Sequence, residues 1–348
     1  MQGSANTQSV PKQRKVLKKI SSATVAEQNL AYVKGRMDGT IKSMVTKFPR
    51  LDNYLMGGLE LDTILCISAL SGAGKSTLSK CIRDSLSKLN TDVEFNQYIF
   101  NFEMVAHQQA ARSIVSNADI SLKKLYSVDE PLTDMEFKGL QAYYDELKGR
   151  KGVWFIETPG TATEIADSLR EYYLKECKPH GKTLVYEIDH ALLTKGRQGA
   201  TEKDRIDELM YALVEVKKQI AADGGHSIGI VLSQMNREIR KPERVQNAEM
   251  HRPNTGDLFG ASSIEQCCDY VLFSHIPAKL NIQKYTLNNY PTRMKIENRW
   301  VQVPYFELVK QRSGESDLTI HIWNNLHRFY FDEMDKDLFQ DLLNVSYK

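Results

Sequence analysis

The sequence predicts an α/β protein built on a mostly parallel, twisted sheet that is flanked by helices and carries a C-terminal antiparallel extension. Short apolar runs rich in β-branched and aromatic residues alternate with helix-length segments, as in parallel sheets with helices on both faces. The runs are almost continuously apolar, which is typical of strands covered on both sides. After residue 300, further strand-like runs follow one another without helices between them.

The elements follow in a regular order. The predicted strands occupy residues 63–68, 98–102, 153–156, 184–188, 228–232 and 270–273. The predicted helices occupy residues 75–90, 105–117, 134–148, 163–177 and 203–222. The C-terminal set consists of the runs FELVKQR, LTIHIW and RFYFD. Residues 276–304 lack a clear period, and we expect a loop or an insertion there.

Composition excludes several classes of protein. The 348 residues contain 46 Lys+Arg and 44 Asp+Glu. This balance excludes a uniformly basic protein that coats nucleic acid, and it also excludes a disordered acidic chain. No apolar stretch approaches the roughly 18 residues of a membrane helix, and we expect no membrane partner. The N-terminus lacks the apolar segment of a secretory signal. Five cysteines without a C-x-x-C pattern indicate the reducing cytoplasm.

The N-terminal residues differ from the rest. We expect residues 1–23 to form a disordered basic arm and residues 24–47 to form an assembly helix and a connector. Thr24 and Glu27 have the spacing of a capping box. The apolar residues of this helix, which need a cover such as another subunit, are Val25, Leu30, Tyr32, Val33 and Met37. The main domain is expected over residues 48–348.

The segment SALSGAGKSTLSK, residues 68–80, follows a strand and opens a helix. It fits the pattern G-x-x-x-x-G-K-[ST], except that Ala69 takes the place of the first glycine. Backbone N–H groups and the helix N-terminus would face phosphates, while Lys75 and Ser76 would serve the β/γ-phosphates and Mg²⁺. The predicted nucleotide-binding residues are Ser71, Gly72, Ala73, Gly74, Lys75, Ser76 and Thr77. The chain is therefore predicted to bind ATP with Mg²⁺.

Hydrolysis requires a metal anchor and a base that orients water. Asp189 ends an apolar strand and is the predicted metal anchor, whereas Glu187 lies within that strand and is secondary. Glu103 ends another strand and is the predicted general base, because ligands of open α/β sheets bind at the carboxyl ends of strands. A simpler interpretation is that these carboxylates are solvated or cap helices.

Two further features fit hydrolysis. Gln234 ends a strand, where its neutral amide could bind a γ-phosphate or water without opposing its charge. Lys310 and Arg312 are two residues apart, so they share one side of a strand. Their charge could stabilise the transition state in a neighbouring subunit.

Taken together, these motifs resemble a known family. The segments concerned are FPRLDNYLMGGLELDTILCISALSGAGKST, YIFNFEM, LVYEIDHALL, VLSQMNREI, RPNTGDLFGASSIEQCCDYVLF and FELVKQRSG. Over residues 24–335 the chain resembles the C-terminal motor domain of DnaB-type replicative helicases, which are RecA-like P-loop ATPases. The resemblance implies a homo-hexameric ring that moves 5′ to 3′ on single-stranded DNA during replication, in the cytoplasm of a bacterium or of a phage-infected host.

The resemblance also implies roles for residues. Lys75 and Ser76 would contact the phosphates and Mg²⁺, and Asp189 would bind Mg²⁺ through water. Glu103 would be the catalytic base, and Gln234 would be the γ-phosphate sensor that is linked to the DNA loop. Lys310 and Arg312 would be cations that act in trans on the adjacent subunit's nucleotide. A primase or a helicase loader would be a further partner. Ala69 resembles a variation seen within the family.

Two departures from the family concern its partners. The family's DNA loop has a basic residue near Phe259 and an acidic one near Gly260, so a side-chain contact to DNA there is in question. The family's N-terminal helical domain, which contacts primase, has no counterpart in this sequence.

Two polar loops could face DNA. The residues after Gln234 form a polar stretch that contains Pro242, and we expect a loop there. A second loop follows Asp189. The predicted DNA-binding residues are Arg237, Arg240, Lys241 and Arg244 in the first loop and Lys195 and Arg197 in the second. The alternative is that both are ordinary solvated loops.

A second function remains open from the sequence. A RecA- or RadA-like ATPase that depends on DNA and acts in recombination or regulation would share the phosphate loop without unwinding DNA. A scaffold that does not hydrolyse ATP is disfavoured, because Lys75, Glu103 and Asp189 are all present.

Overall fold

The computed structural model describes residues 19–118, 120–196, 199–296, 298–335 and 339. The chain divides into two compact units, residues 1–42 and residues 43–348. Most of the predicted basic arm lies outside the described residues. Within the part of the chain that is described, no helix has the length and apolar character needed to cross a membrane.

The first unit contains helix α1 (Ser22–Met37). Its N-cap is Ser21, whose Oγ accepts a hydrogen bond from the Thr24 backbone N–H at 3.1 Å. The predicted capping box of Thr24 and Glu27 is therefore wrong, because Thr24 already lies in the first helical turn and uses the cap of Ser21. Several apolar side chains of α1 are exposed, namely Val25, Leu30, Val33 and Met37.

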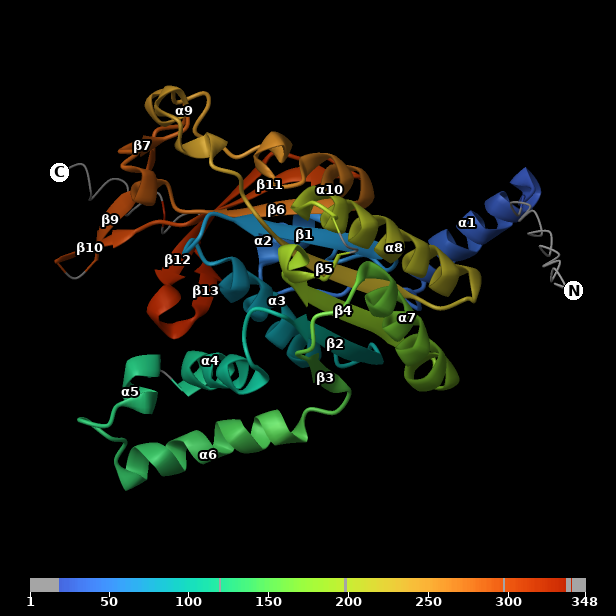
Figure 1. Cartoon of the computed structure of the whole chain (residues 1–348), viewed down its shortest axis with the longest axis horizontal. Helices are drawn as coiled ribbons and strands as arrows, with labels where there is room; N and C mark the ends of the chain where they lie inside the picture. The colour runs from blue at the N-terminus through green and yellow to red at the C-terminus, as the bar shows by residue number, and fades with distance from the viewer. Residues whose placement is uncertain (1–18, 119, 197–198, 297, 336–338, 340–348) are drawn as a thin grey trace, which may run out of the picture. The chain divides into compact units, whose positions relative to one another are not determined.

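The second unit is built on a nine-stranded sheet with the order β13-β12-β11-β6-β1-β5-β4-β2-β3 (Figure 1). The parallel strands are β1 (Thr63–Ala69), β2 (Phe95–Asn101), β3 (Val153–Ile156), β4 (Thr183–Asp189), β5 (Ser227–Gln234) and β6 (Tyr270–His275). The antiparallel strands are β11 (Tyr305–Gln311), β12 (Leu318–Asn325) and β13 (Tyr330–Glu333). The predicted fold class is confirmed.

Helices precede β1 and connect the parallel strands, and several of them cover the two faces of the sheet. They are α2 (Pro49–Tyr54), α3 (Lys75–Leu89), α4 (Ala106–Ala118), α5 (Leu122–Tyr126), α6 (Asp134–Gly149), α7 (Ala162–Tyr172), α8 (Glu202–Ala222) and α10 (Ala261–Cys267). Capping boxes begin α6, α7 and α8, at Thr133, Thr161 and Thr201. The predicted helix over 163–177 is regular only to Tyr172 and continues as the π-helical turn η1 (Tyr173–Cys177).

Two predicted loops contain short elements. The segment after Gln234 holds the 3₁₀ turn η4 (Glu238–Arg240) and α9 (Pro242–Gln246). Pro242 begins α9 because the first helical position tolerates proline. Within 276–304, the structure describes the 3₁₀ turn η6 (Pro277–Leu280) and two small hairpins. Their strands are β7 (Lys284–Tyr285) with β8 (Tyr290–Pro291), and β9 (Arg293–Ile296) with β10 (Arg299–Gln302).

The core lies on both faces of the sheet. Along β1, Ile64 and Cys66 pack into a cluster with α7, α8 and α10, whereas Leu65 and Ile67 pack into a cluster with α2 and α3. The alternation follows from the two-residue period of a strand. Both sides of each central strand are thus buried, which explains why the runs are continuously apolar.

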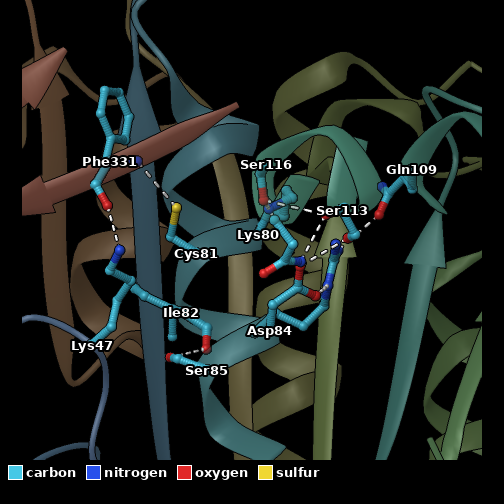
Figure 2. A network of polar contacts seen from close by, with 12 residues as sticks. Lys47, Lys80, Cys81, Ile82, Asp84, Ser85, Gln109, Ser113, Ser116 and Phe331 are labelled. Atoms are coloured by element: carbon cyan, nitrogen blue, oxygen red, sulfur yellow. Dashed lines mark hydrogen bonds and ion pairs between the residues drawn. The ribbon is translucent and has the colours of Figure 1, made fainter. Parts of the chain in front are cut away.

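A polar seam joins α3 to α4, as Figure 2 shows, and continues from Arg83 to Glu187 on β4. We call its members the α3–α4 seam: Lys80, Arg83, Asp84, Gln109, Ser113, Ser116 and Glu187. Lys80 Nζ donates to Ser116 Oγ at 2.7 Å, and Ser113 Oγ donates to Asp84 Oδ2 at 2.8 Å. Arg83 Nη1 lies 3.1 Å from Glu187 Oε1 and donates to Gln109 at 2.8 Å. The seam therefore fixes α4 against the helix that begins at the phosphate loop.

Charges in the seam compensate one another. Burial alone would raise the pKa of Asp84, but the cations of Arg83, Lys80 and Arg150 hold it well below its ordinary value. Glu187 is 2% exposed and accepts hydrogen bonds from Ser79 and Arg83. Removing one partner of a buried ion pair leaves an uncompensated charge, which is strongly destabilising.

We predict that Arg83→Met lowers the free energy of unfolding by about 3–5 kcal/mol, because Glu187 loses its cation. The double variant Arg83→Met/Glu187→Leu should recover most of this loss, since neither charge is then buried. Urea denaturation monitored by circular dichroism measures both. Lys148→Met is the control, because the pair of Lys148 with Asp145 is exposed and should contribute at most about 0.5 kcal/mol. A double variant no more stable than Arg83→Met would contradict this account.

Candidate nucleotide-binding and catalytic site

The phosphate loop connects β1 to α3, and its conformation requires glycine. Gly72 and Gly74 have φ angles of +73° and +89°. A Cβ atom on Gly74 would also collide with the Phe331 ring. Gly74 is the N-cap of α3, so the first N–H groups of this 15-residue helix point into the loop. They form a ready anion site.

Strand register brings the predicted residues to this edge of the sheet. Ala69 at the end of β1 pairs with Gln234 at the end of β5, and Asn101 at the end of β2 pairs with Asp189 at the end of β4. The Phe102 backbone N–H also donates to the Asp189 carbonyl at 2.8 Å, which holds Glu103 beside the end of β4.

A cavity of about 530 Å³ lies in front of the loop. Of the predicted nucleotide-binding and catalytic residues, it is lined by Ser71, Gly72, Gly74, Lys75, Ser76, Thr77, Glu103 and Gln234. Ala73 instead lies on the opposite side of the loop, next to a second cavity. Asp189 does not line this cavity but a separate small pocket, which shares Ser76 and Thr77 with it. The phosphate loop, the Glu103 carboxylate and the Gln234 amide therefore line the same cavity.

Asp189 is 1% exposed, and its negative charge is only partly compensated by neighbouring groups. The Lys75 Nζ lies 3.8 Å from Oδ1, which has no hydrogen-bond partner in the described residues. Burial raises the pKa of Asp189 to about 6, with Lys75 opposing and the charges of Glu187 and Glu103 adding to the rise. A buried carboxylate oxygen beside the Ser76 hydroxyl fits a Mg²⁺ ion, which prefers oxygen ligands shared with substrate phosphates.

Glu103 and His190 differ from Asp189 in their surroundings. Glu103 is exposed at the cavity, where its carboxylate can reach solvent water. Burial, with the neighbouring Lys75 charge, lowers the pKa of His190 to about 4. His190 is therefore neutral near pH 7 and adds no positive charge to the site.

The structure adds cavity residues that the sequence analysis missed. The Arg112 guanidinium lies 4.6 Å from the centroid of the Phe329 ring, and Leu326 lies beside it. Leu326 and Phe329 give the cavity an apolar wall that could accept a nucleotide base. Gln108 also lines the cavity, and its four-residue spacing from Arg112 on α4 was a signal for a shared helix face.

Lys310 and Arg312 lie at the opposite edge of the sheet. Gln311 pairs with Tyr270, the first residue of β6, and the Arg312 Nη1 lies 3.0 Å from Asp269 Oδ1. Asp269 in turn accepts the Ile64 N–H at the start of β1. The seven residues of β1 separate this point from the phosphate loop, a span of roughly 20 Å at about 3.3 Å per residue.

The Lys310 and Arg312 side chains have different surroundings. The Lys310 ammonium donates to the carbonyls of Glu265 and Cys268, and burial lowers its pKa. The Arg312 side chain is 50% exposed. Neither cation lies near the phosphate loop of its own chain.

The predicted DNA-binding residues fall into three groups. Arg237, Arg240, Lys241 and Lys195 are exposed. Arg244 is instead 12% exposed, forms an ion pair with Asp257, and donates to the carbonyls of Met250 and Arg252. Arg244 thus holds its own loop together, a role that the composition of the loop did not reveal. Arg197 lies outside the described residues.

Residues 43–330 match the DnaB-like helicase C-terminal domain. The chain belongs to this helicase family. Membership identifies it as an ATP-hydrolysing helicase and confirms the resemblance and the enzyme class that the motifs predicted.

Solved structures share the fold. One of them, described as an ATPase domain, is 16% identical, with a TM-score of 0.70 over 89% of this chain and 98% of that domain. A DnaB-like replicative helicase, whose structure was described together with its interactions with primase, is 18% identical. Its TM-score is 0.69 over 91% of this chain and 68% of the other. No curated protein sequence matches the chain.

We predict that Glu103→Gln binds ATP but hydrolyses it at least about 10²-fold more slowly, because the amide keeps the shape and loses the base. Lys75→Ala should instead weaken ATP binding itself, since the phosphate cradle loses its point charge. Fluorescent ATP-analogue binding and steady-state phosphate release separate the two effects. Wild-type turnover in Glu103→Gln would transfer the role of base to another carboxylate.

Proposed function

We propose that the chain assembles into a homo-hexameric ring that couples ATP hydrolysis to 5′-to-3′ movement along single-stranded DNA in replication. The position of Lys310 and Arg312 is the main support. Both lie roughly one strand length from the phosphate loop of their own chain, and Arg312 is half-exposed. They are therefore too far away to act at the site of their own chain, which supports a role at the site of a neighbouring copy.

Each ATP would then lie between two subunits. Lys75 and the N–H groups that begin α3 would hold the β- and γ-phosphates, while Ser76 and Asp189 would hold Mg²⁺. The bound ion would neutralise charge that develops on the phosphates. Glu103 would orient the attacking water and accept its proton, and Arg312 of the next subunit would stabilise the transition state.

The end of β5 would link ATP to DNA. Gln234 lines the nucleotide cavity, and Arg237 follows it by three residues in the exposed loop. The Gln234 carbonyl also accepts the Phe259 N–H at 2.9 Å, so a shift of Gln234 would reach that segment as well. We propose that Arg237, Arg240, Lys241 and Lys195 contact the DNA backbone, and that Arg244 supports the loop.

The same proposal gives α1 a place in the ring. Its exposed Val25, Leu30, Val33 and Met37 would pack on a neighbouring subunit, because apolar side chains gain stability when they leave water. A primase or a helicase loader would act on the assembled ring. The solved helicase with a primase partner supports this part by analogy.

Forked DNA tests the function directly. We expect the wild-type protein to displace a labelled strand when the fork carries a 5′ single-stranded tail, with ATP and Mg²⁺ present, and to fail on a substrate with only a 3′ tail. EDTA and Lys75→Ala should each abolish displacement. ATPase activity that single-stranded DNA stimulates, without displacement from either substrate, would favour the alternative of a RecA- or RadA-like ATPase.

A further inference from the structure

The first turn of the 276–304 insertion touches the phosphate loop from behind. The Lys279 ammonium, on η6, donates a hydrogen bond to the Gly72 carbonyl. A Cβ atom added to Gly72 would meet this ammonium at 3.3 Å, so the ammonium also lies close to the Gly72 Cα. The end of β6 makes a similar contact, since Ser274 Oγ donates to the Ala73 carbonyl at 2.6 Å. The insertion therefore supports the tip of the loop that would hold ATP.

A cavity of about 710 Å³ opens on this side of the phosphate loop. Three segments form its walls. They are the phosphate loop at Ser71, the insertion at Lys279, and the exposed loop after Gln234, here called the basic loop, at Arg240 and α9. Ser71 lines both this cavity and the nucleotide cavity, so the phosphate loop lies between the two cavities. The insertion and the basic loop thus meet the nucleotide site at one place.

The charge of this cavity is positive. Arg240 and Lys279 are its charged lining residues, and no carboxylate lines it in the part of the chain that the structure describes. Arg240 and Lys279 have no ion-pair partner among the described residues, whereas the adjacent Lys241 is paired with Glu238. Two exposed cations that share one cavity without an acid favour an anionic ligand.

The ligand chemistry follows from the walls. A nucleotide already has its own cavity on the other side of the phosphate loop, where Lys75 and the N-terminus of α3 lie. Arg240 belongs to the same exposed loop as Arg237, and both are among the residues proposed to contact the DNA backbone. A phosphodiester of single-stranded DNA carries one negative charge and is the anion that such a loop would deliver.

We propose that one DNA phosphate binds in this cavity between Arg240 and Lys279, and that Lys279 transmits its presence to the phosphate loop. The inference rests on the proposed function, because it requires that the loop after Gln234 meets DNA. The Lys279 ammonium has three N–H donors, and a charged phosphate attracts it more strongly than the neutral Gly72 carbonyl does. A bound DNA phosphate would thus draw the ammonium toward Arg240 and weaken the hydrogen bond that holds Gly72. This change would alter the conformation of the phosphate loop.

Salt dependence tests the binding site. Binding of a labelled oligo-dT is measured by anisotropy, with a non-hydrolysable ATP analogue present, at several salt concentrations. Loss of one phosphate contact should reduce the slope of log K against log salt by about 0.7 for a single strand. We expect this loss in Lys279→Gln/Arg240→Gln, and an unchanged slope in the control Lys284→Gln, an exposed lysine of the same insertion.

ATPase rates at saturating DNA test the transmission. We expect the ratio of DNA-stimulated to basal turnover to fall toward one in Lys279→Gln, to stay near the wild-type ratio in Arg240→Gln, and to recover in Lys279→Arg, which keeps the charge. A wild-type ratio in Lys279→Gln would overturn the transmission.

Other outcomes separate the two proposals. An unchanged slope in the double variant would overturn the DNA site. A raised KM for ATP without DNA, with an unchanged slope, would assign Lys279 to the nucleotide. A smaller assembly in Lys279→Gln, with an unchanged slope, would show that a neighbouring subunit fills the cavity. Wild-type protein that does not bind DNA at all would overturn the proposed function itself.

Discussion

The machinery of this protein depends on the shared register of four parallel strands. β1, β5, β4 and β2 end close to one another, so the phosphate loop, Gln234, Asp189 and Glu103 meet at one edge of the sheet. A slip of one residue would turn every side chain of a strand to the other face. The apolar clusters on both faces prevent such a slip, because each strand buries alternate side chains in different clusters.

The same sheet places Arg312 far from the phosphate loop, whereas the loop after β5 reaches from the nucleotide cavity to β11. β11 runs antiparallel to β6 and carries Arg312 to the edge opposite the phosphate loop. The basic loop after β5 is tied at its start to Gln234 and near its end to β11, where Arg252 Nε lies 2.6 Å from Glu307 Oε2. Glu307 is fully buried and also accepts hydrogen bonds from Tyr285 and Thr319. One loop thus connects the nucleotide cavity with β11, the strand that carries Lys310.

Much of this arrangement could be predicted, for identifiable physical reasons. Strands buried on both faces leave continuous apolar runs, and a phosphate loop needs glycines before Lys75 and Ser76, so both were visible in the sequence. The cavity role of Phe329 was not, because only the folded sheet brings it to Arg112. Arg244 resembled its exposed neighbours, since an ion pair with Asp257 leaves no local pattern. The cap of α1 was misplaced because Ser21 and Thr24 both suit an N-cap.

Mixed assemblies test the central claim, that Arg312 completes the site of a neighbour. Arg312→Ala and Lys75→Ala subunits, each deficient alone, are combined at several ratios, and ATPase activity is measured after mass photometry shows mixed assemblies. The account predicts partial recovery, because some interfaces then pair an intact Lys75 with an intact Arg312. No recovery at any ratio, with mixed assemblies present, would contradict it.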